Sequence, residues 1–125
     1  MVSLNASVLD QLPGSLSGGQ RQRVGIARAI ATESCFVVAD EPATALDVSV
    51  QAQILNLLKD LQEQIGLSCL FISHDLAVVE HMSDRIAVLS NGRLVEVGDR
   101  DTILSSPRHP QTRALIEASS RADDF

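Results

Sequence analysis

The feature of this sequence that most constrains its fold is a long amphipathic segment between two short apolar runs. Residues 48–65 repeat apolar side chains at helical spacing, with Asp47 able to cap the start of a helix and Gly66 its end. The flanking runs, residues 35–39 and 67–72, are continuously apolar, which is typical of strands buried on both faces of a parallel sheet. A strand, a crossover helix and a second strand predict a right-handed βαβ unit. We therefore expect an α/β fold with a parallel sheet core and flanking helices.

Ionisable residues follow both predicted strands at the point where each strand ends. Asp40 and Glu41 come directly after the first run, and His74 follows the second. Because ligands of open α/β sheets bind at the carboxyl ends of the strands, two carboxylates and an imidazole are expected in one crevice. The alternative is that charges at strand ends serve only solubility.

A third pattern precedes the first strand. Residues 16–20 place Ser17 and two glycines before an amphipathic segment, residues 20–31, that reads as a helix. Ser15 or Ser17 can cap this helix, and glycines without Cβ atoms leave its first N–H groups open to an anion such as phosphate. Ser-Gly-Gly is also a common cap and loop. The arginines that follow, Arg21 and Arg23, either line a solvated face or contact a nucleotide.

In this order and spacing, the motifs resemble those of the ATP-binding-cassette (ABC) ATPases. Residues 16–20 resemble the family's signature motif, residues 37–41 its Walker B strand with the catalytic glutamate, residues 45–47 its D-loop, and His74 its switch histidine. The resemblance spans residues 12–118. It implies that residues 1–125 form part of an ABC ATPase domain, the C-terminal half of a P-loop NTPase-type fold. The signature helix would span 16–32, the Walker B strand 35–41 and a C-terminal extension 99–125.

The resemblance also implies a role for each site residue, with ATP and Mg²⁺ as cofactors. Asp40 would hold Mg²⁺ through water, Glu41 would be the general base, and His74 would contact the γ-phosphate. The signature residues would bind the nucleotide of a second ABC ATPase subunit, in a homodimer or a heterodimer, and the D-loop aspartate would cross that interface. These residues are Ser17, Gly18, Gly19, Gln20 and Asp47. The run Ser73-His74-Asp75 is not expected to be a hydrolase triad, because neighbours at a strand end point apart.

Two further segments resemble the ATP-binding subunits of oligopeptide, dipeptide and nickel importers, namely residues 47–55 and 106–115. Gln111 stands where that group usually has Tyr, and Ala43 and Thr44 where Thr-Ser or Val-Ser is commoner. Neither difference affects a catalytic carboxylate. The resemblance implies a cytoplasmic subunit, peripheral at the inner face of the cell membrane, with transmembrane permease subunits as partners.

The phosphate loop of these ATPases, G-x-x-x-x-G-K-S/T, does not occur in the sequence, whose one lysine is Lys59. We therefore expect the C-terminal half of an importer ATPase that binds ATP weakly and turns over little by itself. Its strands would lack part of their cover, at Val37, Val38, Leu70 and Phe71. An alternative is a non-catalytic accessory fragment that supplies its signature motif to a complete or split ATPase.

Charge and composition bear on the remaining classes. A formal net charge of −6 argues against general nucleic-acid binding. That charge, and the lack of a long heptad array, disfavour the chromosome-segregation and DNA-repair ATPases that share these motifs. Cys35 and Cys69 lie in apolar runs and are expected to be small core residues of a cytosolic protein.

The C-terminal part is predicted to hold short elements. Residues 76–82 form a helix, Asn91-Gly92 turns a β-hairpin between residues 85–90 and 93–97, and a short helix runs from Asp99 to Leu104. A last helix is expected over residues 112–118, followed by a frayed tail over residues 119–125.

Overall fold

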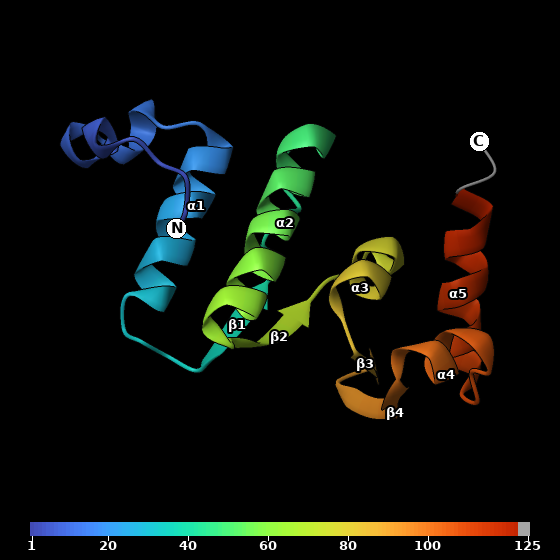
Figure 1. The fold of residues 1–125 in the computed structure, drawn as a ribbon. Helices are drawn as coiled ribbons and strands as arrows, with labels where there is room; N and C mark the ends of the chain where they lie inside the picture. Colours follow the sequence, from blue (N-terminus) through green and yellow to red (C-terminus); the bar gives the residue numbers. More distant parts are fainter. Residues whose placement is uncertain (123–125) are drawn as a thin grey trace. The chain divides into compact units, whose positions relative to one another are not determined.

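The computed structural model describes residues 1–122 of the chain and divides it into two compact units (Figure 1). Unit 1 comprises Met1–Ile72 and unit 2 comprises Ser73–Phe125. No helix in the described part has both the length and the apolar character needed to cross a lipid bilayer.

Unit 1 contains the predicted βαβ unit, preceded by a helix. Two short 3₁₀ helices, Ala6–Asp10 and Pro13–Ser15, lead into the following four elements: α1 (Gly18–Ile30), β1 (Phe36–Asp40), α2 (Val48–Ile65) and β2 (Ser68–Ile72). Strands β1 and β2 pair in parallel, with Phe36 opposite Ser68 and Asp40 opposite Ile72. The predicted α/β fold with a parallel strand pair is confirmed.

Helix α2 begins and ends where the sequence predicts. The Asp47 carboxylate accepts the N–H of Val50 at 3.1 Å, and Gly66 ends the helix in the left-handed conformation, with φ of +66°. The buried side of α2 supplies half of the buried hydrophobic residues of unit 1, namely Ile54, Leu55, Leu57, Leu58 and Leu61. Ile65, predicted to continue this apolar stripe, is 43% exposed in the last turn.

The two strands of unit 1 are buried on one face only, so the expectation of burial on both faces is wrong. Val37, Ala39, Cys69 and Phe71 lie on the covered face and are buried or half-buried. The opposite face, which we call the open sheet face, exposes its apolar side chains by 42–56%; they are Phe36, Val38, Leu70 and Ile72. Alternate residues of a strand point to opposite faces, and the described elements of unit 1 cover just one of them. The predicted loss of cover therefore applies to Val38 and Leu70 and much less to Val37 and Phe71.

The two cysteines do not share one environment. Cys69 is half-buried in β2, and this burial raises the pKa of its thiol. Cys35 is exposed, which corrects the prediction of a core residue. It precedes β1 and takes part in the sheet through its carbonyl group, which accepts the N–H of Ser68 at 2.9 Å.

Unit 2 is built on an antiparallel hairpin with three helices. Its elements are α3 (Leu76–Met82), β3 (Arg85–Ser90), β4 (Arg93–Asp99), α4 (Arg100–Ser105) and α5 (Pro110–Ala122). Asn91 and Gly92 have φ of +49° and +72°, as a two-residue hairpin turn with both central residues left-handed requires. The hairpin prediction is confirmed, with a second strand two residues longer than expected. The core is a cluster of Ile86, Val88 and Ile103, against which Val79, Val95 and Leu104 pack.

Helix α5 is longer than the sequence predicts. It starts at Pro110, a residue suited to the first position of a helix because the N–H it lacks would have no partner there. It continues to Ala122, so the frayed tail predicted from Ser119 is helical over residues 119–122. The rest of that predicted tail, residues 123–125, lies outside the described residues.

Candidate functional site

The carboxylate that follows β1 sits on an unusual backbone. Glu41 has φ of +49°, a left-handed conformation that is rare for residues other than glycine. Its N–H donates to the carbonyl oxygen of Ile72 at 2.9 Å, which continues the pairing with β2 past the end of the sheet. Strained backbone of this kind persists where the surroundings fix it and is concentrated at functional sites.

The residues after Glu41 fold back toward it in a tight turn, residues 41–46, which we call the Glu41 turn. The N–H of Leu46 donates to the Ala43 carbonyl oxygen at 3.2 Å. Pro42 and Ala43, which belong to the turn, are buried. The hydroxyl of Thr44, an exposed residue, donates a hydrogen bond to Oε2 of Glu41. The turn therefore holds both the backbone and the carboxylate of Glu41. The sequence analysis treated Thr44 only as a departure from the importer group that does not affect a catalytic carboxylate; this hydrogen bond to Glu41 corrects that expectation.

Asp40 is the last residue of β1 and is exposed. A single exposed carboxylate fits a Mg²⁺ ion held through water, because Mg²⁺ keeps several of its water ligands. Within residues 1–122 no group of three or more His, Cys, Asp or Glu side chains could hold a metal directly.

The start of α1 is closed by a reciprocal pair of hydrogen bonds. Ser17 Oγ accepts the N–H of Gln20 at 3.2 Å, and Gln20 Oε1 accepts the N–H of Ser17 at 2.9 Å. Ser17 is therefore the cap, one of the two residues predicted for that place. Ser15, the other, donates to the carbonyl oxygen of Leu12 at 2.7 Å.

The two glycines of α1 are packed against the chain itself. A Cβ atom on Gly19 would lie 2.6 Å from Cγ1 of Val50, and one on Gly18 would lie 3.0 Å from Cδ2 of Leu46. The space that we expected to be open to another molecule is thus filled, on the Cβ side, by Leu46 and by Val50 in the first turn of α2. The N–H groups of Gly18 and Gly19 form no hydrogen bond with any described residue, so an anion site at these groups stays a prediction.

Asp47 and Arg23 both have partners within unit 1. Asp47 Oδ1 accepts from the N–H of Val50 and from the Ser49 hydroxyl, at 3.1 and 3.2 Å. Its proposed place at a dimer interface is not tested by these contacts. Arg23 donates to the carbonyl oxygen of Val2 at 3.0 Å and to Oε1 of Gln53 at 3.3 Å. These contacts give Arg23 a structural role, while Arg21 is exposed.

His74 belongs to unit 2, whereas Asp40, Glu41 and the signature residues belong to unit 1. The shared crevice therefore stays a prediction. The neighbours of His74 serve as caps: Ser73 Oγ accepts the N–H of Asp75 at 3.1 Å, and Asp75 Oδ1 accepts the N–H of Ala77 at 3.0 Å. The expectation that the run is not a hydrolase triad stays a prediction.

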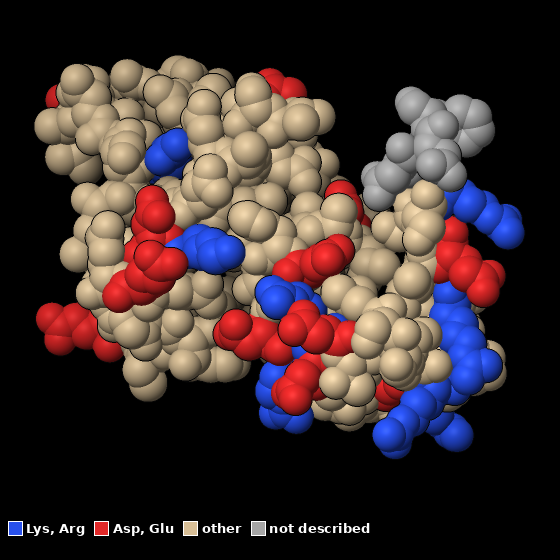
Figure 2. Space-filling model, turned by 45° about the vertical axis from the view of Figure 1, so that its right-hand side comes forward, with Lys and Arg blue, Asp and Glu red and all other residues tan. Residues whose placement is uncertain are grey.

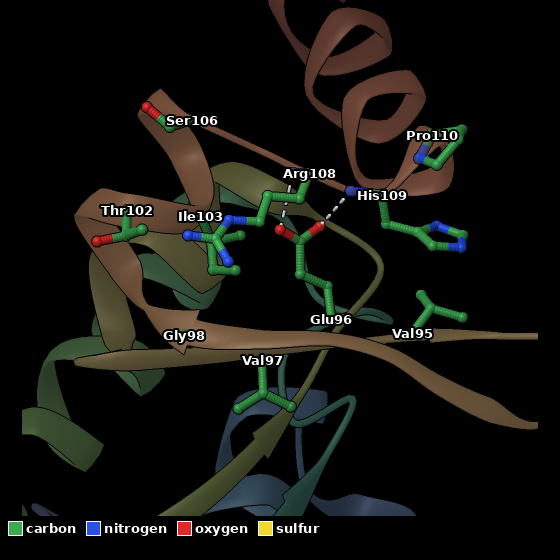
Figure 3. Close-up of a pocket in the computed structure, with 10 residues that line it drawn as sticks. All are labelled: Val95, Glu96, Val97, Gly98, Thr102, Ile103, Ser106, Arg108, His109 and Pro110. Atoms are coloured by element: carbon green, nitrogen blue, oxygen red, sulfur yellow. Dashed lines mark hydrogen bonds between the residues drawn. The ribbon is translucent and has the colours of Figure 1, made fainter.

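Unit 2 has a polar cluster of its own that sequence reasoning missed (Figure 3). The Glu96 carboxylate accepts the backbone N–H groups of Arg108 and His109 at 2.8 and 3.0 Å. The nearby hydroxyl of Thr112, and then these N–H groups, lower the pKa of Glu96 to about 2. The Thr112 side chain is buried, and its hydroxyl has no hydrogen bond of ordinary geometry to the described residues. His109 Nδ1 accepts the N–H of Gln111, in the first turn of α5, at 3.1 Å.

Glu96 lies at a bulge and lines a cleft of about 440 Å³. Strand β4 pairs Leu94 with Leu89 but Glu96 with Val88, so one residue is inserted between them. Such a bulge breaks the simple alternation of faces, and the sequence pattern could not predict where Glu96 lies. The cleft is lined by Val95, Glu96, Val97, Gly98, Thr102, Ile103, Ser106, Arg108, His109 and Pro110.

Charged side chains of both signs are mixed over the visible surface. Figure 2 shows Lys and Arg next to Asp and Glu in the lower part of the face in view, with a group of adjoining Lys and Arg side chains at its lower right.

Comparison with known sequences identifies relatives over nearly the whole chain. Residues 1–44 match the profile of the family described as ABC transporter. The chain is 53% identical over 120 residues to the dipeptide transport ATP-binding protein DppF of Escherichia coli, covering 96% of this chain and 36% of that protein. It is 52% identical over 122 residues to a peptide import ATP-binding protein of Brucella ovis, covering 98% of this chain and 38% of the relative.

Solved structures give the same result. A metal-chelate type ABC transporter in an inward-facing conformation matches with a TM-score of 0.72 and 33% identity, covering 84% of this chain and 40% of that one. A dimeric ATP-binding cassette bound to ADP and Pi matches with a TM-score of 0.68 and 35% identity, covering 79% and 42%. The chain thus spans less than half the length of the proteins it matches. Sequence, motif order and fold agree that this chain belongs to the ABC transporter ATP-binding family.

Proposed function

We propose that this chain supplies the signature motif and the catalytic carboxylate of an ATP site in an ABC importer ATPase. The observation that carries the proposal is the position of Glu41, directly after β1, with its backbone tied to Ile72 and its carboxylate to Thr44. A carboxylate held in this way suits a general base that takes a proton from an attacking water. The positive φ of Glu41 supports the proposal, because backbone strain of this kind is concentrated at functional sites.

The remaining site residues take the roles that the family resemblance implies. Asp40 would hold Mg²⁺ through water, and the ion would supply charge stabilisation on the phosphate oxygens. His74 would contact the γ-phosphate. The signature residues Ser17, Gly18, Gly19 and Gln20 would face the nucleotide of a second ABC ATPase subunit, and Asp47 would lie at that interface.

Peptide import is the transport process that we propose. The support comes from relatives named as dipeptide transport and peptide import ATP-binding proteins, at 52–53% identity. Permease subunits in the membrane would be the partners that carry the substrate, which would place this chain at the inner face of the cell membrane.

The 125 residues contain no G-x-x-x-x-G-K-S/T sequence, so the phosphate loop of the site must come from other residues. We therefore expect the purified 125-residue chain to bind MgATP weakly and to hydrolyse little of it.

The test is a reconstitution in which this chain is mixed with a polypeptide carrying the phosphate-loop half of the domain. ATP hydrolysis should appear on mixing, and Glu41→Gln should lower its rate by roughly 10²–10⁴-fold, the usual contribution of a general base. Lys59→Gln, which changes a residue of α2 outside the proposed site, serves as the control and should leave the rate unchanged.

Three outcomes would count against the proposal in different ways. Glu41-dependent hydrolysis at micromolar MgATP by the chain alone would refute the expected low activity. No hydrolysis on mixing would refute the catalytic role. Stimulation of a complete ATPase by the Glu41→Gln chain as strongly as by the unchanged chain would favour the alternative, a non-catalytic accessory subunit.

A further inference from the structure

The Glu41 turn contains a contact that the family resemblance does not assign. Thr44 meets Glu41 twice: its hydroxyl donates to Oε2 of the carboxylate, and its N–H donates to the Glu41 carbonyl at 3.5 Å. Both residues lie in unit 1 and are three positions apart. The contact therefore forms within the turn itself.

The Thr44 hydroxyl does not need Glu41 as a hydrogen-bond partner. Thr44 is exposed, so its hydroxyl could be satisfied by water at little cost. Pro42 and Ala43, between the two residues, are buried and hold the turn in place. Thr44 is consequently presented to the carboxylate by a fixed support.

A hydrogen bond to one carboxylate oxygen has a directional consequence. An ionised carboxylate has about four acceptor positions on its two oxygens, and the Thr44 hydroxyl occupies one of them on Oε2. The backbone of Glu41 is already fixed by its bond to Ile72, which leaves side-chain rotation as the main freedom of the group. The hydroxyl restrains that rotation by holding Oε2.

We infer that Thr44 is a positioning residue for Glu41: its hydroxyl holds the carboxylate in the orientation in which it accepts the proton of the attacking water. The inference rests on the proposed function, in which Glu41 is the base. Thr44 itself touches neither nucleotide nor water in this role. It acts through the orientation of one carboxylate.

The first test uses the reconstituted ATPase described above. Thr44→Val keeps the shape of the side chain and removes the hydroxyl, and we expect kcat to fall about tenfold with KM for MgATP unchanged. The acid limb of the kcat–pH profile should move to higher pH, because a hydrogen bond to the charged carboxylate is lost. Thr44→Ser keeps the hydroxyl and should restore both values.

A double variant separates positioning from general damage. In the Glu41→Gln background, Thr44→Val should cause no further loss, because the group on which Thr44 acts is gone. A second, equal loss in that background would overturn the inference. If Glu41→Gln itself leaves the rate unchanged, the proposed function fails; if only Thr44→Val does, the positioning role fails and the proposed function stands.

A second test needs no hydrolysis. The side-chain carboxyl carbon of Glu41 can be followed by ¹³C NMR in the 125-residue chain, with its signal assigned through Glu41→Gln. Protonation of this carboxyl should shift to higher pH in Thr44→Val and stay unchanged in Thr44→Ser. Equal titrations in all three chains would overturn the inference. Should Thr44→Val lower the Tm, Thr44→Ala carries the same test with a smaller side chain.

Discussion

Which side chain a position tolerates can depend on its contacts with residues that are distant in the sequence. Gly19 is buried at the start of α1, and the space where its Cβ would stand is filled by Val50 of α2. At Gly25, in the middle of the same helix, the position of a Cβ faces open space, with no atom within 4 Å apart from its chain neighbours and the nearby backbone of α1. Two glycines of one helix are therefore under different constraints, and substitution can separate them.

Gly19→Ala should destabilise the chain by about 1–3 kcal/mol, the usual cost of overpacking, because the new methyl group and Val50 cannot share the space. Gly25→Ala should be neutral or stabilising by about 0.5–1 kcal/mol, since alanine is the better helix former. Val50→Ala should recover most of the loss when combined with Gly19→Ala. Urea unfolding followed by circular dichroism measures all of these, and equal effects at the two glycines would contradict the packing argument.

At the scale of elements, hydrogen bonds from side chains fix the segments at which helices begin. Glu96 is the main example in unit 2, because its carboxylate ties β4 to the segment between α4 and α5 (Figure 3). The capping box of Ser17 and Gln20 does the same for the start of α1. These bonds set where α1 and α5 begin.

The Glu96 contact predicts a pH dependence of stability. The pKa of this carboxyl is lowered from 4.5 to about 2 in the folded chain, so its stabilising effect is present above about pH 4.5 and is lost as pH falls toward 2. Solvent and salt screen the effect, because the group is not deeply buried. In Glu96→Gln the free energy of unfolding should vary less with pH between 4.5 and 2.

Urea unfolding at a series of pH values measures this difference. Glu117→Gln, at an exposed position of α5, removes the same charge and serves as the control. An unchanged slope in Glu96→Gln, or an equal change in Glu117→Gln, would mean that the contact does not contribute.

For the whole molecule, net charge and the open sheet face have opposite effects on association between copies of the chain. A formal net charge of −6 keeps copies of the chain apart at neutral pH, whereas four exposed apolar side chains on a two-stranded sheet favour association. The repulsion vanishes near the sequence pI of about 4.8. Association should therefore be strongest near that pH.

Val38→Lys should suppress this association, because it places a charge on the open sheet face, where Val38 is 56% exposed. Val48→Lys adds the same charge at a valine of the same unit that is 84% exposed at the start of α2, outside that face, and should suppress it much less. Light scattering between pH 4 and 8 compares the two. Equal suppression would show that charge alone, rather than the open sheet face, controls association.

The sequence by itself determined the elements and the order of the motifs. Helix α2, its caps, the parallel strand pair and the Asn91-Gly92 turn all follow from periodicity and from residues with strong local preferences. Such signals lie within a few residues of one another, so they can be read without knowing the fold. The membership of the ABC transporter ATP-binding family was predictable for the same reason.

Only the tertiary structure decided which surfaces these elements share. The open side of β1 and β2, the packing of Gly19 on Val50 and the bulge at Glu96 depend on neighbours distant in sequence, which no local pattern records. The hydrogen bond from Thr44 to Glu41 spans three residues, yet it requires the left-handed backbone that pairing with Ile72 imposes. The sequence thus indicated Glu41 as the proposed general base, and the fold determined how its carboxylate is held.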